Sequence, residues 1–254
     1  MIIAVIEKGI KVIEFLSGHS EGISLAGISS ALGIPKSSVH HILQTYMTND
    51  YVKQDPETKK YSLGAKFLQL SSKILEGFDI RKIARSYLLE LQQVCKETVQ
   101  IYILSRGKMV CIEKIGHPSG GLLSISSFVG WTTEPHPSAA GKVLLSELPE
   151  EEILKIYPNR RLKPYGKNTI TDFDEFLDEL KIIKKQGYAI DDEEYYEGVR
   201  CVSAPVRAGG EIVASISVTG SIFSMTMKKI NQNFIPNIIK TAEAISAELV
   251  NFKV

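Results

Sequence analysis

The chain has 254 residues, with 30 Lys and Arg against 29 Asp and Glu, and 44% of its residues are hydrophobic. This near-neutral composition excludes a disordered tail, a collagen-like fibre and a strongly basic architectural protein, and the length suits one large domain or two ordinary ones. The three cysteines form no CxxC pair, so we expect neither a disulfide framework nor a zinc ribbon. The longest apolar run at the N-terminus, residues 1–6, is too short for a membrane span, and we expect a cytoplasmic protein.

The first part of the chain is predicted to be helical. Apolar residues between Val5 and Leu16 recur at helical spacing, which predicts a helix with one wide buried face. Ser24 is placed to cap a second helix, and Gly33 followed by Pro35 forces a turn before a third. The three predicted helices end near Gly18, at Leu32 and at Thr48.

Two paired strands and a linker helix are predicted to follow. Residues 51–53 and 60–62 suit strands, and the stretch between them contains the turn residues Asp and Pro. We therefore expect a first domain over residues 1–63 and a linker helix over residues 64–77.

The remainder of the chain, residues 78–254, is predicted to mix helices with strands that are mostly linked as hairpins. This pattern favours an α+β or α/β ligand-sensing domain over a doubly wound one, and gives a two-domain protein of α+β class. The predicted strands cover residues 99–104, 109–115, 122–126, 188–190, 199–207 and 211–219. The predicted helices cover residues 80–98, 139–148, 150–156, 173–186 and 228–251.

Three short helices followed by a ribbon are typical of a winged helix-turn-helix. The N-terminal turns of the third helix enter a major groove in this fold, where polar side chains reach bases and phosphates. Residues 35–73 carry six lysines and three acidic residues, and lysines on the ribbon suit phosphate contact. The alternative is a three-helix bundle with a solvated polar face. The candidate DNA-binding residues are Lys36, Ser37, Ser38, His40, His41, Gln44, Lys53, Lys59 and Lys60.

Several long motifs occur in the order and spacing of one known family. They are PKSSVHHIL (35–43), YSLG (61–64), HPSAAGKVLL (136–145), GYAIDDEE (187–194), GVRCVSAPV (198–206) and SISVTG (215–220). On these motifs the chain resembles the IclR family of bacterial and archaeal transcription regulators along nearly its whole length. The resemblance implies an N-terminal winged helix-turn-helix that binds operator DNA and a C-terminal GAF-like α/β domain that binds a small-molecule effector. The family usually has arginine where His41 stands, and this chain has no arginine before Arg81, so phosphate contact falls to lysines and neutral donors.

Polar residues of the second domain suggest a ligand pocket. Ser215, Ser217 and Thr219 alternate onto one face of a predicted strand. The helix that begins after Ser138 presents backbone N–H groups that suit a carboxylate. The resemblance implies effector contacts at Leu123, Ser124, Gly141, Asp191, Cys201, Ser217 and Thr219.

The same residues also have structural interpretations, which the sequence leaves open. Cys201 could be a small buried hydrophobe, and Asp191 begins an acidic run that would ordinarily be a solvated loop. Ser217 and Thr219 could form the exposed face of a strand. Trp131, the only tryptophan, could cover a pocket or lie in a core or dimer contact.

Catalysis and metal binding are the less favoured interpretations. Cys201, His136 and Asp191 could act as nucleophile, base and orienting residue, but their spacing does not impose that geometry, and no phosphate-binding loop is present. His117, His136 and Cys201 lack the short spacing of a metal site. His136 could equally contact a ligand or cap the helix after Ser138. We expect no enzyme activity, no metal and no cofactor.

The sequence therefore predicts a ligand-responsive DNA-binding transcription regulator with no membrane association. Its expected partners are double-stranded operator DNA and a small-molecule effector, either a small organic acid or a neutral aromatic compound, in a homodimer or a dimer of dimers. The alternative is a metabolite-binding module whose N-terminal bundle serves dimerisation. The candidate dimer contacts are Ile2, Ile3, Val5, Ile6, Phe67, Leu68 and Leu70.

Overall fold

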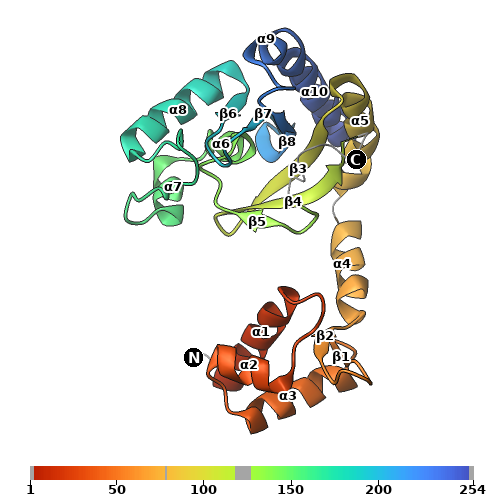
Figure 1. The fold of residues 1–254 in the computed structure, drawn as a ribbon. Coiled ribbons are helices and arrows are strands. Elements are labelled where there is room, and N and C mark those ends of the chain that lie inside the picture. Colours follow the sequence, from red (N-terminus) through yellow and green to blue (C-terminus); the bar gives the residue numbers. More distant parts are fainter. Residues whose placement is uncertain (1–2, 78, 118–126, 252–254) are drawn as a thin grey trace. The chain divides into compact units, whose positions relative to one another are not determined.

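The computed structural model describes residues 3–77, 79–117 and 127–251. The chain divides into two compact units, Met1–Gly77 and Phe78–Val254, which are described separately (Figure 1). The predicted strand over residues 122–126 lies outside the described residues.

The first unit contains three helices, a two-stranded ribbon and a further helix (Figure 1). Ser24 caps the second helix, since its Oγ accepts a hydrogen bond from the N–H of Gly27 at 3.2 Å. Gly33 ends that helix with a φ of 64°, which glycine adopts without steric cost. The Ser29 hydroxyl then donates to the Ile34 carbonyl at 2.7 Å and holds the turn. The elements are α1 (Ala4–Ser17), α2 (Leu25–Leu32), α3 (Lys36–Thr48), β1 (Val52–Gln54), β2 (Tyr61–Leu63) and α4 (Lys66–Glu76).

The ribbon is an antiparallel hairpin that is tied to the helices. Asp55 Oδ1 accepts hydrogen bonds from the backbone N–H groups of Glu57 and Thr58, which orders the turn. Ile23, in the loop before α2, forms an isolated antiparallel bridge with Tyr61 of β2. The ribbon therefore packs against the helices and shares one hydrophobic core with them. That core comprises Val12, Leu16, Ile28, Ile34, Val39, Leu43, Val52 and Tyr61.

The first helix buries a narrower face than its apolar stripe predicts. Val12 and Leu16 are buried, whereas Ile6 and Ile10 are 56% and 52% exposed. The stripe therefore divides into a half that packs within the unit and a half that does not, and the prediction of a single wide buried face was wrong for Ile6 and Ile10.

The second unit is built on a six-stranded antiparallel sheet with the strand order β5-β4-β3-β8-β7-β6 (Figure 1). The two long strands β7 and β8 form a hairpin, with Cys201 opposite Thr219 and Val202 opposite Val218. Successive residues of a strand point to opposite faces, so this hairpin presents different chemistry on its two sides. The strands are β3 (Thr98–Ser105), β4 (Lys108–Ile115), β5 (Thr132–Thr133), β6 (Ala189–Asp192), β7 (Val199–Ala208) and β8 (Glu211–Ser221).

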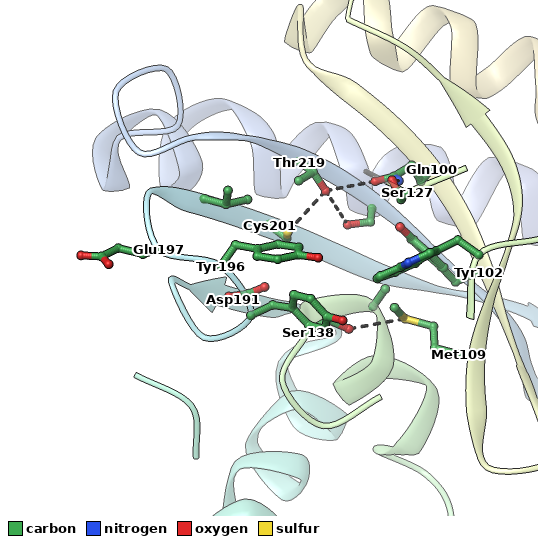
Figure 2. Close-up of a pocket in the computed structure, with 15 residues that line it drawn as sticks. Gln100, Tyr102, Met109, Ser127, Ser138, Asp191, Tyr196, Glu197, Cys201 and Thr219 are labelled. Atoms are coloured by element: carbon green, nitrogen blue, oxygen red, sulfur yellow. Dashed lines mark hydrogen bonds between the residues drawn. The ribbon is translucent and has the colours of Figure 1, made fainter. Parts of the chain in front are cut away.

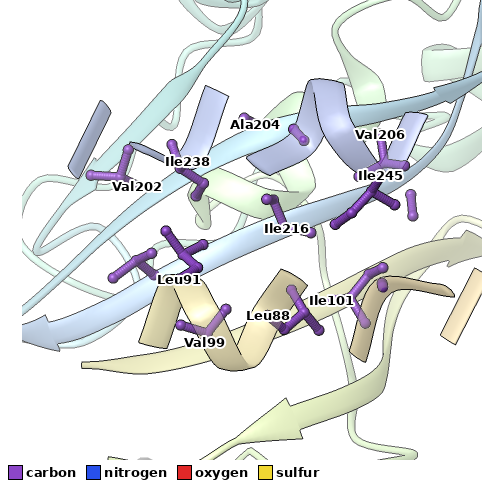
Figure 3. Close-up of a cluster of buried hydrophobic side chains, with 14 of the residues drawn as sticks. Leu88, Leu91, Val99, Ile101, Val202, Ala204, Val206, Ile216, Ile238 and Ile245 are labelled. Carbon is purple, nitrogen blue, oxygen red and sulfur yellow. The ribbon is translucent and has the colours of Figure 1, made fainter. Parts of the chain in front are cut away.

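One face of the sheet packs against the helices α5 (Asp79–Cys95) and α10 (Ile235–Asn251). Figure 3 shows this apolar layer, in which β-branched side chains of the strands meet leucines and isoleucines of the helices. The labelled members are Leu88, Leu91, Val99, Ile101, Val202, Ala204, Val206, Ile216, Ile238 and Ile245. Burial of this layer is the main apolar contribution to the unit.

The helices α6 (Ala139–Leu145), α7 (Glu150–Ile156) and α8 (Phe173–Gln186) surround a second core with residues of the sheet. α6 is shorter than the predicted helix over 139–148. The predicted C-terminal helix is interrupted, because α9 (Met227–Lys229) passes into a π turn, Ile230–Phe234, before α10. Pro236 has no N–H to bond to the carbonyl four residues earlier, and the wider turn accommodates it.

Candidate nucleic-acid interface and ligand cavity

Helix α3 has one buried face and one polar face. Val39 and Leu43 are fully buried beneath it. Ser37, His40, His41 and Gln44 follow the spacing i, i+3, i+4, i+7 on the other side, and all four are exposed. Lys36 is also exposed, and Ser38 is half-buried. No side chain caps the N-terminus of α3, so its first backbone N–H groups remain open to an anion.

The ribbon adds three exposed lysines to this unit. Lys53 lies on β1, and Lys59 and Lys60 lie in the turn and just before β2. Lys59 has a φ of 57°, and its carbonyl accepts a hydrogen bond from the Gln54 amide at 3.0 Å. The turn geometry therefore fixes the backbone positions from which these lysine side chains extend.

In the second unit a cavity of about 260 Å³ opens on the face of the sheet opposite α5 and α10 (Figure 2). Ser217 and Thr219 of β8 lie beside Cys201 of β7, and Asp191 of β6 is the cross-strand partner of Cys201. Three neighbouring strands thus bring these four predicted residues to one cavity. The lining residues are Gln100, Tyr102, Met109, Ser127, Trp131, Ser138, Ala140, Asp191, Tyr195, Tyr196, Glu197, Val199, Cys201, Ser217 and Thr219.

The polar side chains of the cavity are connected by hydrogen bonds (Figure 2). Thr219 Oγ1 lies 3.2 Å from Gln100 Oε1 and 3.3 Å from Cys201 Sγ, and 3.5 Å from the Ser217 hydroxyl. The Gln100 amide donates to the Ser127 hydroxyl at 2.5 Å. These residues are buried or half-buried, so the structural alternative of an exposed strand face for Ser217 and Thr219 was wrong.

Aromatic side chains form the rest of the wall. The Trp131 and Tyr195 rings lie 5.8 Å apart in an edge contact, and Tyr195 also bonds the Thr133 hydroxyl at 2.7 Å. Tyr102 is buried on β3. The sequence interpretation identified Trp131 as one possibility but missed Gln100, Tyr102 and the two tyrosines after Glu194. A glutamine inside the apolar run VQIYI was the available signal for Gln100.

Asp191 lies on strand β6 and not on a solvated loop. It is 1% exposed, and its Oδ1 accepts a hydrogen bond from the N–H of Glu194 at 2.8 Å. Burial, followed by the nearby Glu194 carboxylate, raises the pKa of Asp191 to about 7. The carboxyl group therefore exchanges its proton near neutral pH.

A buried lysine stands behind Asp191. Lys142 is 1% exposed, and its Nζ donates to the Ile190 carbonyl at 2.8 Å and to Glu194 Oε1 at 2.5 Å. Glu179 Oε1 lies 3.5 Å from the same nitrogen. A buried cation persists only when it is paired and hydrogen-bonded, and here the pairing fixes the loop that carries Tyr195 into the cavity. The lysine within the apolar motif AAGKVLL was the sequence signal.

Gly141 does not line the cavity. Its N–H donates to the Ser138 Oγ at 3.1 Å, which occupies one of the N–H groups expected to meet a carboxylate. A Cβ at this position would lie 2.0 Å from the Pro135 carbonyl oxygen, so the glycine is required for close packing. The expectation of a direct effector contact at Gly141 is not supported. Leu123 and Ser124 lie outside the described residues.

His136 does not line this cavity, and both nitrogens of its buried ring have partners. Its Nε2 lies 2.9 Å from the Lys163 carbonyl oxygen and its Nδ1 lies 3.3 Å from the Tyr157 hydroxyl. Burial lowers the pKa of His136, and the ring is absent from the cavity lining. Burial also raises the pKa of Cys201 well above its usual value, the opposite of what a thiolate nucleophile needs.

Within the described ranges 3–77, 79–117 and 127–251, no three His, Cys, Asp or Glu side chains gather as a metal site requires. None of the helices in the described parts of the chain combines the length and apolar character needed to span a bilayer.

Two family descriptions match the chain. "IclR helix-turn-helix domain" matches residues 5–56, and "Bacterial transcriptional regulator IclR C-terminal" matches residues 72–247. The chain belongs to the IclR family. The family members that this chain resembles are named as transcriptional regulators and not as enzymes. The protein is accordingly a transcriptional regulator with a helix-turn-helix DNA-binding domain and a C-terminal α/β ligand-binding domain.

Individual IclR-family proteins resemble it over most of their length. The HTH-type transcriptional regulator XynR of Escherichia coli is 30% identical over 220 residues, which are 86% of each chain. The crystal structure of Thermotoga maritima IclR has a TM-score of 0.79 at 27% identity, covering 96% of this chain and 98% of that one. An IclR homologue from Microbacterium hydrocarbonoxydans, complexed with 4-hydroxybenzoate, shares the fold with a TM-score of 0.80 at 20% identity, covering 96% and 98%.

The raised pKa of Asp191 predicts a pH-dependent stability. An acid that binds its proton more tightly in the folded chain than in the unfolded chain stabilises the fold. This stabilisation is fully present below about pH 4 and is lost as the pH rises to about 7. One pKa unit corresponds to about 1.4 kcal/mol. The free energy of unfolding of Asp191→Asn should therefore rise relative to that of the natural chain, by up to about 4 kcal/mol, as the pH goes from about 4 to about 7.

Urea unfolding of both proteins at pH 5 and pH 8 measures this difference. Asp192→Asn is the control, because the neighbouring carboxylate is 45% exposed and pairs with Arg200 at 2.6 Å. An advantage of Asp191→Asn that does not grow from pH 5 to pH 8 contradicts the prediction.

Proposed function

We propose that the polar face of α3 and the lysines of the ribbon form the operator-binding surface. The observation that carries this proposal is the two-sided helix, whose buried Val39 and Leu43 hold Ser37, His40 and Gln44 outward. Side chains on the first turns of such a helix reach base edges, while Lys53, Lys59 and Lys60 contact phosphates beside the groove.

The operator-bound protein is proposed to be a homodimer or a dimer of dimers. Apolar side chains of the first unit support this, since Ile3 and Ile6 of the α1 region are each 56% exposed, and Leu68 and Ile74 of α4 are 75% and 62% exposed. Exposed apolar surface of this kind is removed from water by pairing. A dimer also supplies two recognition helices, and specific DNA binding requires two when each DNA-binding module is short. Acting on chromosomal DNA, the protein works in the cytoplasm.

The effector is proposed to be a small organic acid that carries a further hydroxyl or carbonyl oxygen. Ser217, Thr219 and Gln100 offer hydrogen bonds, and the aromatic walls cover an apolar ring or chain. No Lys, Arg or His is among the described lining residues, and the sequence of residues 118–126, PSGGLLSIS, contains none. A carboxylate therefore needs a neutral donor, which protonated Asp191 supplies. The homologue complexed with 4-hydroxybenzoate supports this ligand class.

Effector binding is proposed to shift the population of two conformations that present the paired α3 helices differently. Direct contacts are assigned to Asp191, Cys201, Ser217 and Thr219. The family membership disfavours the alternative of a module that binds metabolites but not DNA.

Removal of ribbon charge should weaken DNA binding uniformly. We expect Lys53→Ala and Lys60→Ala each to reduce affinity for the chain's own upstream DNA about threefold to tenfold, and to reduce the salt slope by about one, because each lysine releases counterions from a phosphate. Electrophoretic mobility shift assays at several salt concentrations from about 50 to about 200 mM measure both the affinity and the salt slope. Lys181→Ala, an exposed lysine of the second unit paired with Asp178, is the control and should bind normally. Unchanged salt slopes in both ribbon variants would place the phosphate contacts elsewhere.

Loss of one cavity hydroxyl should weaken effector binding alone. In thermal-shift titrations with 4-hydroxybenzoate and other small hydroxy acids, we expect Ser217→Ala to weaken binding about tenfold, since it removes one hydrogen bond to a charged group. Ser203→Ala is the matched control, because Ser203 is the buried cross-strand partner of Ser217 but does not line the cavity. Effector-free DNA binding should be unchanged in both. Equal losses in the two variants, or no stabilisation by any acid, contradict the assignment.

A further inference from the structure

Glu113 of β4 is a buried carboxylate that binds two arginines of α5. It is 3% exposed, and its Oε2 lies 2.9 Å from Arg81 Nε and 2.8 Å from Arg85 Nη1. Its Oε1 accepts a hydrogen bond from the N–H of Lys114 at 3.1 Å. Apart from Gln92, the other buried side chains of α5 are apolar, so this cluster is the charged attachment of the first turns of the helix to the sheet.

A β-bulge aims Glu113 at the helix. The register between β3 and β4 shifts at Ile101 and Tyr102, which pair with Glu113 and Cys111 and leave Ile112 unpaired. Beyond the bulge the alternation of β4 is reversed, so Glu113 shares the α5 side of the sheet with Ile101. A strand without the bulge would turn this carboxylate toward the cavity side.

The next residue of β4 serves the opposite face. Lys114 pairs with Gln100, and its Nζ donates to the Ser127 carbonyl at 2.7 Å. The Ser127 hydroxyl in turn accepts the Gln100 amide at 2.5 Å, and both residues line the cavity. Two consecutive residues, Glu113 and Lys114, therefore connect the cavity wall to α5 across the sheet.

We infer that Glu113 is a positioning residue that couples occupancy of the cavity to α5, and through the start of α5 to the DNA-binding unit. α5 begins at Asp79, two residues after the last residue of the first unit, so any displacement of its first turns acts on the connection to that unit. A ligand that rearranges Gln100 and Ser127 displaces Lys114, and the stiff β4 backbone carries this movement to Glu113 and its arginines. The inference rests on the proposed effector cavity and operator surface.

Coupling is reciprocal, so DNA can be used to probe the cavity when the effector is unknown. Trp131 is the only tryptophan of the chain and lines the cavity, and its emission reports the cavity alone. We expect a saturating duplex of the chain's own upstream DNA to shift Trp131 emission in the natural protein. In Glu113→Gln, which keeps the shape but removes the charge, the shift should be at least threefold smaller while the DNA affinity stays within about threefold.

Two further variants separate coupling from loosening of the fold. Glu147→Gln removes a carboxylate that binds Arg207 at 2.6 Å elsewhere in the same unit, and should keep the full shift. Lys114→Met breaks the connection from the cavity side and leaves the Glu113 cluster in place, so it should reduce the Trp131 emission shift as Glu113→Gln does. This variant tests the inference even if Glu113→Gln fails to fold.

The outcomes distinguish the inference from the proposal beneath it. A full shift in Lys114→Met, equal losses in Glu113→Gln and Glu147→Gln, or no shift in a natural protein that is bound to DNA would each overturn the inference. Failure of the natural protein to bind the duplex would instead refute the proposed operator surface, and the inference with it.

Discussion

The antiparallel pairing of β7 with β8 is the constraint on which the second unit depends. Because side chains alternate along a strand, Val202 and Ile216 face the helices α5 and α10, while Cys201 and Ser217 face the cavity. The apolar side stabilises the sheet, and the polar side is free to be shaped for a ligand. A slip of one residue would exchange these roles and destroy both.

The first unit uses the same division on a helix. Val39 and Leu43 attach α3 to the core, and the side chains one turn apart on the opposite side remain exposed. One face of α3 therefore stabilises the first unit, and the opposite face carries the proposed contacts with DNA. The apolar residues of α1 and α4 that this core leaves exposed are the surface we propose for pairing with a second copy.

The sequence predicted the features that depend on local pattern. Ser24, Gly33 and the turn at Asp55 act as expected, because caps and turns are decided by a few neighbouring residues. The hydroxyl stripe of β8 was also predicted, since alternation is visible in a single strand. These signals account for most of the elements, whereas Asp191 and Cys201 were placed in the cavity by the resemblance to the IclR family.

The features that were missed depend on distant parts of the chain. Asp191 was read as a possible loop residue because its strand is short and its burial comes from β7. Lys142 gave no visible partner, since Glu194 is 52 residues away. The bulge that directs Glu113 to α5 appears only when β3 and β4 are paired, and no periodicity in the strand announces it. Ile6 shows the converse, because an apolar stripe does not reveal whether the chain itself covers it.

The central claim is that paired α3 helices hold operator DNA under the control of the cavity. Native mass spectrometry of the full chain bound to a duplex from its own upstream region tests the pairing most directly. The account predicts complexes with two or four protomers on each duplex. Saturated complexes that contain one protomer would contradict it.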